Sequence, residues 1–491
     1  MEGVELTPTL EEVRTLARES TLVPLRHTFI DDCETPVAAY LKLRGDGPSF
    51  LLESAEQGQR FGRWSFLGWR PRTIIRLEDG VLTVGGERRD GGDPYAAVAA
   101  ELERYRIAPL EGLPPFAGGA VGLFGYDLVR HAEPTVGPGN PDDVGTPEMA
   151  LMVSDVLVAF DHLRHEVTVL ANVFVEDDVD GAYAAAAGAI AEVLERLAEP
   201  VPRAHTGAHD VPRFRSNIGS DGYADAVERC KEYIRAGDAY QVVPSQRWSA
   251  EAPVEAFSIY RGLRTINPSP YMYFLDFEDF EIAGASPESL IKVTGRRAEQ
   301  RPIAGTRPRA DTVDGDLRRA DELLADEKER AEHVMLVDLA RNDLGKVCEY
   351  GTVTVDELMV VETYSHVLHI VSSVSGTLRE GVTAMDGLRA SLPAGTLSGA
   401  PKIRAMQIID ELEPVGRGPY GGSVGYLSYT GDLDTCIYIR SALVKDGRVH
   451  VQAGGGIVTD SDAESEVRET EAKAGAVFGA IELACRQRDW V

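Results

Sequence analysis

The sequence predicts an α+β protein, on the strength of three observations. Helical and strand-like stretches both occur, but they do not alternate with the regular βαβ spacing of a doubly wound sheet. Residues 420–458 form a series of hairpin-like pairs, YGGSVGYLSYTGDLDTCIYIRSALVKDGRVHVQAGGGIV, which indicates mainly antiparallel sheet. With 491 residues, 43% of them hydrophobic, the chain is long enough for two or three domains or one large two-part enzyme.

Short strands separated by turns are predicted for most of the first 200 residues. Residues 22–87 contain PSFLLES, TIIRLEDG and VLTVGG, which are apolar runs closed by turn residues. FAGGAVGLFGY at 116–126 is a glycine-rich apolar strand region. MALMVSDVLVAF from 149 is too short and too polar to span a bilayer, so we expect a buried strand. GAYAAAAGAIAEVLERLA at 181–198 is predicted to be a helix.

A proline-containing segment without clear periodicity, 201–217, is predicted to link an N-terminal region, 1–200, to a C-terminal region, 218–491. The C-terminal region opens with a predicted helix at 221–238 that ends at Gly237, followed by the strand YQVVPSQRW.

Two further helices are predicted in the C-terminal region. One covers 321–344, DELLADEKERAEHVMLVDLARNDL. The other follows the glycine triplet 454–456 and begins with a capping box made by Ser461 and Glu464. Its apolar stripe contains Val467, Ala474, Phe478, Ile481 and Cys485.

The charge and the cysteines exclude several classes of function. Acidic residues outnumber basic ones by 79 to 50, a formal charge of −29, so we expect no nucleic acid and no membrane as partner. The acidic start of the chain, MEGVELTPTLEEV, lacks the apolar core of a signal peptide. Five scattered cysteines without a CxxC pair are typical of reduced thiols in a cytoplasmic protein: Cys33, Cys230, Cys348, Cys436 and Cys485.

Two of the predicted helices carry carboxylates beside faces that should be buried. On the C-terminal helix, Glu466, Glu469 and Lys473 share a face at spacings of three and four. On the helix before it, Glu329 and Glu332 are in register with core leucines. A simpler interpretation exists for each: a solvated face with a Glu469–Lys473 ion pair, and two glutamates beyond the edge of the core.

Two Glu-x-x-Glu pairs suit Mg²⁺, because this ion prefers oxygen ligands and often binds one or two carboxylates together with water and an anionic substrate. Zinc and iron more often recruit histidine or cysteine. Buried carboxylates without partners are costly, so a cation or strong hydrogen-bond donors are expected beside them.

An ordered set of motifs resembles the chorismate-utilising enzymes and, within them, the anthranilate synthase component I branch. The set covers nearly the whole chain and is highly specific as a set. Its members are LLES (51–54), NPSPYM (267–272), RPIAGTRPR (301–309), DEKERAEHVMLVDLARNDLG (326–345), GTLSGAPK (395–402), PYGG (419–422), IYIRS (437–441) and QAGGGIV (452–458).

The resemblance implies a four-layer α/β/β/α architecture with two largely antiparallel sheets, two closely packed subdomains and Mg²⁺-dependent chemistry on chorismate, a dicarboxylate. The implied metal ligands are Glu332 and Glu469, supported by Glu329 and Glu466. Glycine amides can approach an anion closely, although a bulge or tight turn would also explain the triplet. The implied substrate-binding residues are Gly305, Thr306, Tyr420, Arg440, Gly454, Gly455, Gly456 and Lys473.

The implied reaction adds ammonia at C2 of chorismate, expels the C4 hydroxyl and then eliminates pyruvate to give anthranilate. The hydroxyl leaves poorly unless it is protonated, and Glu288 matches the family's general acid; the alternative is a strand-end glutamate after a Ser-Pro turn. His369 and Thr396 match positions beside the departing pyruvate, although a lone histidine on a strand is more often structural. Gln241 and Ala304 stand where water-adding relatives and aminodeoxychorismate synthases, respectively, carry a lysine, so both favour anthranilate formation.

The resemblance also implies partners and a regulator. The sequence contains no G-x-C-x-G nucleophile turn, so ammonia is expected from a separate glutamine amidotransferase subunit in a heterotetramer. Feedback inhibition by tryptophan is expected at a second site, with hairpin packing as the structural alternative. That site comprises Glu53, Ser54, Pro270, Tyr271 and Met272.

Three alternatives remain open at this stage. The rivals to anthranilate formation are an aminodeoxychorismate synthase, an enzyme that stops at 2-amino-2-deoxyisochorismate, and a non-catalytic metabolite sensor with the same fold. Ala304 argues against the first. A sensor would be expected to have lost some of the acids or Arg440.

Overall fold

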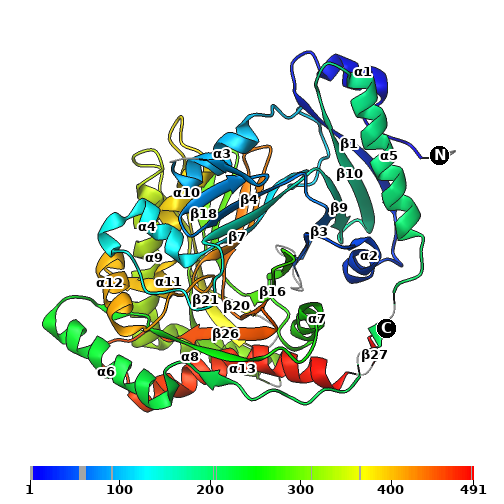
Figure 1. The fold of residues 1–491 in the computed structure, drawn as a ribbon. Helices are drawn as coiled ribbons and strands as arrows, with labels where there is room; N and C mark the ends of the chain where they lie inside the picture. Colours follow the sequence, from blue (N-terminus) through cyan, green and yellow to red (C-terminus); the bar gives the residue numbers. More distant parts are fainter. Residues whose placement is uncertain are drawn as a thin grey trace.

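Two large antiparallel sheets lie between two layers of helices (Figure 1). The computed structural model describes residues 4–54, 62–89, 92–202, 204–205, 207–310, 312–363, 367–487 and 489–490. The α+β class with two antiparallel sheets is confirmed.

The first sheet has eleven strands. Its order is β1 (Leu22–Ile30), β10 (Glu166–Phe174), β9 (Val156–Asp161), β3 (Trp64–Trp69), β2 (Ser49–Glu53), β15 (Tyr271–Asp276), β16 (Phe280–Ser286), β25 (Ser441–Lys445), β26 (Arg448–Gly454), β14 (Ser245–Glu251) and β12 (Arg215–Ser216).

The second sheet has twelve strands, with β20 (Thr354–Thr363) paired to β21 outside the main path. Its order is β19 (Ile303–Pro308), β21 (Val367–Thr377), β18 (Arg297–Gln300), β17 (Ser289–Thr294), β24 (Leu433–Ile437), β23 (Ser423–Ser428), β7 (Gly119–Phe124), β8 (Met149–Ser154), β4 (Thr73–Glu78), β5 (Val81–Val84) and β6 (Glu87–Arg89). Two short pairs complete the strands: β11 (Ala204–His205) with β27 (Asp489–Trp490), and β13 (Gln241–Val242) with β22 (Gly399–Ala400).

Helices cover the outer face of each sheet. An apolar core joins the eleven-stranded sheet to α1 (Leu10–Leu16), α2 (Pro36–Leu43), α5 (Val179–Leu197), α7 (Ala256–Ile266) and α13 (Ala463–Arg486). The twelve-stranded sheet contacts α8 (Val313–Ala325), α9 (Glu327–Gly345) and α10 (Ala384–Ser391), and α10 in turn contacts α3 (Pro94–Glu103). The remaining helices are α4 (Val129–Ala132), α6 (Gly219–Ala236), α11 (Gly395–Ser398) and α12 (Lys402–Leu412).

Both predicted regions contribute strands to each sheet. The two halves meet where β2 pairs with β15, with Glu53 opposite Met272, and where β7 pairs with β23, with Phe124 opposite Ser423. The segment 201–217 holds β11 and β12, which pair with β27 and β14. The division at 201–217 stays a prediction, whereas the close packing of the two halves is a direct result of these shared sheets.

Two helix boundaries predicted from the sequence are wrong. The single helix expected over 321–344 is α8 followed by α9, because the Asp326 carboxylate accepts hydrogen bonds from the N–H groups of Lys328 and Glu329 and starts a new helix. The N-cap of α13 is Asp462 instead of Ser461, whose hydroxyl accepts from Val458 N–H. In each place an aspartate side chain accepts from the first free N–H groups and begins the helix.

The described part of the chain contains no helix that is both long and apolar enough to cross a bilayer.

Candidate active site

One cavity of about 610 Å³ gathers nearly all the residues predicted for catalysis, substrate and metal. We call it the acidic cavity. It is lined by parts of β19, β21, β26, α9, α11 and α13. The predicted residues that line it are Gln241, Glu288, Gly305, Thr306, Glu329, Glu332, His369, Thr396, Tyr420, Arg440, Gly454, Gly456, Glu466, Glu469 and Lys473.

Of the four glutamates predicted as metal ligands, Glu332 and Glu466 have no cationic side chain among the described residues as a direct partner. Burial raises the pKa of Glu332, and nearby Glu329 adds to the shift; burial likewise raises the pKa of Glu466. Gln241 Nε2 lies 3.4 Å from Glu332 Oε1, a weak contact. Glu466 Oε2 is buried and has no hydrogen-bond partner. A buried carboxylate oxygen in this state is ready to accept a cation or a donor from a ligand.

The other two glutamates have cationic partners. Glu329 Oε1 lies 3.0 Å from Arg307 Nη1, and Glu469 Oε1 lies 2.8 Å from Lys473 Nζ. The ion pair on the α13 face therefore exists, as the simpler interpretation expected, but it lines the cavity instead of a remote solvated surface.

The donor set fits Mg²⁺. All four candidate ligands are carboxylates, one of their oxygens is orphaned, and they come from two helices. Among the described residues, the one group of three acidic or thiol side chains within 4.8 Å of one another is Asp31, Asp32 and Cys33, far along the chain from this cavity. An open arrangement of glutamates suits an ion that keeps several waters and shares its coordination with a substrate.

Glu288 follows β16, in the turn that leads into β17. Burial raises the pKa of its carboxyl to about 7, and the hydrogen bond from Thr396 Oγ1 to Oε1, at 3.0 Å, opposes part of that rise. A carboxyl with a pKa near neutrality can both hold and release a proton at physiological pH, which is what a general acid requires.

His369 projects from β21 into the acidic cavity. Its Nδ1 lies 2.8 Å from the carbonyl oxygen of Gly305 and 3.2 Å from Thr306 Oγ1. Since a carbonyl only accepts, the contact assigns the proton to Nδ1. Burial lowers the pKa of the ring, so the neutral form prevails near pH 7.

Arg440 brings a cation to the cavity from a strained backbone position. Its φ is 54°, in the left-handed region that residues other than glycine rarely adopt. Its Nη1 donates to the carbonyl of Lys473 at 2.9 Å, and Lys473 Nζ donates to the carbonyl of Gly454 at 2.9 Å. Backbone strain of this kind clusters at functional sites, where the surrounding structure maintains it.

Each glycine of the triplet admits a different neighbour. A Cβ at Gly454 would lie 2.4 Å from the carbonyl oxygen of Pro244, and one at Gly456 would lie 2.4 Å from Gln241 Nε2. A Cβ at Gly455 would lie 2.8 Å from Glu466 Oε2. The triplet therefore lets two separate segments, 241–244 and the start of α13, approach it closely at the cavity.

Gly455 is the one predicted residue of this set that does not line the cavity. Its N–H donates to Tyr223 Oη at 3.0 Å and lies 3.3 Å from the carbonyl oxygen of Pro244. Contact between its amide and a substrate stays a prediction, and the geometry instead shows it making room for Glu466.

Two polar lining residues were not predicted, Lys328 and Gln452. Lys328 resembles any exposed lysine on a charged helix turn, so its sequence carries no signal. Gln452 occupies a polar position of β26, on the face opposite the buried Val449, Val451 and Ala453. Ordinary alternation explains such a residue equally well, so its sequence carries no signal either.

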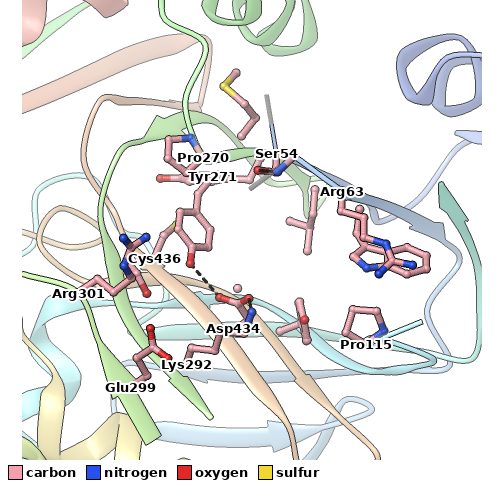
Figure 2. A pocket seen from close by; sticks show the side chains of 18 of the residues that line it. Ser54, Arg63, Pro115, Pro270, Tyr271, Lys292, Glu299, Arg301, Asp434 and Cys436 are labelled. Carbon is pink, nitrogen blue, oxygen red and sulfur yellow. Dashed lines mark hydrogen bonds and ion pairs between the residues drawn. The ribbon is translucent and has the colours of Figure 1, made fainter. Parts of the chain in front are cut away.

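A second cavity, of about 650 Å³, lies between the two sheets. We call it the junction cavity. All five residues predicted for the inhibitor line it, namely Glu53, Ser54, Pro270, Tyr271 and Met272. Figure 2 shows Pro115 and Arg63 across the cavity from Arg301 and Glu299, so charged side chains lie on both sides of it.

The charges of the junction cavity are largely paired. Tyr271 Oη donates to Asp434 Oδ1 at 3.1 Å, and Lys292 Nζ lies 3.2 Å from Asp434 Oδ2 (Figure 2). The Glu53 carboxylate accepts from Tyr260 Oη and from Arg264 on α7. A cavity with apolar walls and a few placed polar groups is the usual form of a small-molecule site.

Comparison with known proteins assigns the family. A model described as chorismate binding enzyme matches residues 47–479, a span that contains every residue lining the acidic cavity. The chain belongs to this family.

Relatives in the family cover almost the whole chain. Anthranilate synthase component 1 of Pseudomonas aeruginosa is 48% identical over 96% of this chain and 98% of that protein. The same-named protein of Thermus thermophilus is 49% identical over 94% of this chain and 98% of that protein. The crystal structure of anthranilate synthase component I from Streptococcus pneumoniae superposes with a TM-score of 0.78 at 39% identity, covering 92% of this chain and 99% of that one. The predicted family membership is confirmed.

Proposed function

We propose that this chain is the aminase component of anthranilate synthase, which converts chorismate and ammonia to anthranilate and pyruvate in the cytoplasm, the first step of tryptophan synthesis. The observation that carries the proposal is Glu288, a partly buried carboxyl with a pKa of about 7 in a cavity that also holds cations and further acids. The names of relatives with nearly half of their residues identical support the same choice.

Chorismate has two carboxylates, and the acidic cavity offers matching groups for them. Arg440 and Lys473 supply positive charge, and the buried Tyr420 lies beside the glycine strand end. Glu332 and Glu469, supported by Glu329 and Glu466, would hold Mg²⁺, which when bound supplies positive charge for a substrate carboxylate.

The first step forms a C2–N bond and breaks the C4–O bond as the ring double bonds shift. Glu288 gives its proton to the departing hydroxyl, which leaves as water. The new ammonium group releases one proton, so chorismate and ammonia become 2-amino-2-deoxyisochorismate and water. Gln241 lacks a basic group, which suits a neutral amine nucleophile because ammonia attacks without prior deprotonation.

The second step breaks the bond between the ring and the enolpyruvyl oxygen. The ring loses its C2 proton, pyruvate leaves, and the product becomes aromatic. The neutral imidazole of His369, held by the Gly305 carbonyl, acts beside the departing group, together with Thr396. A histidine fixed in one tautomer is well suited to proton transfer near neutral pH.

A glutamine amidotransferase subunit supplies the ammonia in a heterotetramer, and tryptophan binds in the junction cavity as feedback inhibitor. The designation component 1 of the relatives supports a second component, because it names one part of a larger enzyme.

A single assay tests the proposal. Purified chain with chorismate, Mg²⁺ and ammonium at mildly alkaline pH is expected to yield a blue-fluorescent aromatic amine and an equal amount of pyruvate. A non-aromatic aminated product would overturn anthranilate formation in favour of the aminodeoxychorismate or 2-amino-2-deoxyisochorismate alternatives. Binding of chorismate or tryptophan without turnover would favour the sensor.

A further inference from the structure

A fully buried ion pair lies behind the acidic cavity, between Glu413 after α12 and Arg417 in the loop before PYGG. The side chains are 6% and 2% exposed. Arg417 Nε donates to Glu413 Oε2 at 2.9 Å, and Nη2 donates to Oε1 at 2.5 Å, so the guanidinium and carboxylate meet as a two-pronged fork.

The remaining donors and acceptors of the pair reach two other chain segments, at Leu397 and at 243–245. Arg417 Nη1 donates to the carbonyl of Leu397 at 2.6 Å, and Nη2 donates to the carbonyl of Val243 at 2.6 Å. Glu413 Oε1 accepts from the backbone N–H of Ser245 at 2.8 Å and from its Oγ at 2.9 Å.

Each of these segments carries a side chain that lines the acidic cavity. Leu397 follows Thr396, the donor to Glu288, and Val243 stands two residues after Gln241. Ser245 Oγ accepts a hydrogen bond from Gln452 Nε2 at 2.8 Å.

The guanidinium also contacts two aromatic rings. Its Cζ lies 5.6 Å from the ring centre of Tyr420, which lines the cavity, and 4.7 Å from that of Tyr126. Both separations are within the range of cation–π contact. The pair therefore contacts three segments that line the cavity, at 396–397, 241–245 and Tyr420, without lining the cavity itself.

Thermodynamics alone does not account for such a pair. Removing two charges from water is costly, and apolar residues of similar volume often give equal or greater stability. The directional bonds to two backbone carbonyls and one backbone N–H are what an apolar pair could not reproduce. Helix α11 has only four residues and no side-chain N-cap. Arg417 donates a hydrogen bond to its Leu397 carbonyl and so helps to fix its position.

We propose that the Glu413–Arg417 pair is the positioning element of the active site, fixing Thr396, Gln241 and Tyr420 around the acidic cavity. This inference rests on the proposed function. Displacement of a catalytic group by about 1 Å costs roughly 100-fold in rate, so loss of the fork should act on turnover more than on substrate binding.

The test compares Arg417→Lys and Glu413→Gln with Arg130→Lys. Arg130 pairs with Asp410 on α12 and is largely buried, but neither residue lines the cavity, which makes it a matched control. With ammonium as substrate, kcat per folded molecule is expected to fall about 100-fold in the first two variants while KM for chorismate changes by less than about threefold. The control is expected to keep kcat within about twofold despite a similar loss of thermal stability.

A double-mutant cycle with Thr396→Ala separates positioning from general destabilisation. If Arg417 acts through the Thr396 segment, the fold-loss in kcat of the double variant should be much smaller than the product of the two single fold-losses. For Arg130→Lys combined with Thr396→Ala, the two fold-losses in kcat should multiply. An Arg417→Lys variant with kcat close to that of Arg130→Lys, or a purely multiplicative cycle, would overturn the inference.

If Arg417→Lys and Glu413→Gln do not fold, Ser245→Ala removes one hydrogen bond to Glu413 and is expected to lower kcat about fivefold. Unchanged kcat in this variant would overturn the inference equally. A wild-type chain that forms no anthranilate would overturn the proposed function and this inference with it. If the wild type is active and the variants keep its kcat, only this inference is overturned and the proposed function stands.

Discussion

The acidic and junction cavities have nearly the same volume, about 610 and 650 Å³, but their polar groups are satisfied differently. In the acidic cavity Glu466 Oε2 and Gln241 Oε1 are buried without partners, and burial raises the pKa of Glu288. Among the described residues that line the junction cavity, no buried side-chain N or O atom lacks a partner.

The difference matches the work expected of each site. A reaction centre must keep groups available for substrate, metal and proton transfer, so part of its polar surface stays uncompensated without them. A site for an amino acid needs only shape and a few oriented contacts, and its own charges can neutralise each other. The two sites are adjacent in sequence, because Glu288 lines the acidic cavity and Ser289 lines the junction cavity.

The largest expected effect comes from the acids that would hold the metal. Glu332→Gln and Glu469→Gln should each lower kcat by about 10³-fold, because each removes a charge that stabilises the bound anion and its metal. Ammonium-dependent anthranilate formation, measured by fluorescence with circular dichroism as a check of folding, tests this. As a control, Glu464→Gln replaces an exposed glutamate on α13, the helix that carries Glu469, and should leave kcat unchanged. Equal loss in all three would show that the acidic cavity has no special role.

Glu288→Gln should lower kcat by roughly 10²-fold, the lower end of the range for loss of a general acid or base. The sign of the pH dependence follows from the protonated form being active. Burial raises the pKa of Glu288 to about 7, so wild-type kcat should be level below that pH and fall as the pH rises through it. Free ammonia must be held constant across the series.

Thr396→Ala sharpens this prediction. The hydrogen bond from Thr396 lowers the pKa of Glu288, so its removal should shift the alkaline limb to higher pH. A limb that stays in place in Thr396→Ala, or persists in Glu288→Gln, would assign the titration to another group.

The junction cavity should control inhibition without controlling turnover. Ser54→Trp places a large ring in the cavity, so the tryptophan concentration for half inhibition should rise at least about tenfold while kcat with ammonium stays within about twofold. In the wild type, tryptophan at 100 times its Kd should raise the free energy of unfolding by about 2.7 kcal/mol. If saturating tryptophan caused no inhibition and no thermal stabilisation, this assignment would be refuted.

The smallest effect is expected from Tyr271→Phe, which removes the hydrogen bond to Asp434 in the junction cavity. The free energy of unfolding in urea should fall by about 1 kcal/mol, the net contribution of one such bond. Activity with ammonium should not change. Tyr350→Phe, at a fully exposed tyrosine, is the matched control and should have no measurable effect on stability.

The sequence by itself determined the α+β class, most strands and helices, and a set of site residues, nearly all of which line one of the two cavities. Local periodicity sets which face of an element is apolar, and ordered motifs identify a family whatever the three-dimensional path between them. The Glu-x-x-Glu pairs were visible for this reason, since a helix places residues three or four apart on one face.

The tertiary structure alone decided how distant segments meet. The roles of Gly454, Gly455 and Gly456 depend on Pro244, Glu466 and Gln241, which pack against them from elsewhere in the chain. The contacts of the Glu413–Arg417 pair with Val243 and Ser245 join segments more than 150 residues apart in sequence. No local pattern encodes such contacts, because they follow from strand pairing and helix packing across the whole molecule. These pairings bring the four glutamates, Arg440, Lys473 and Glu288 into one cavity.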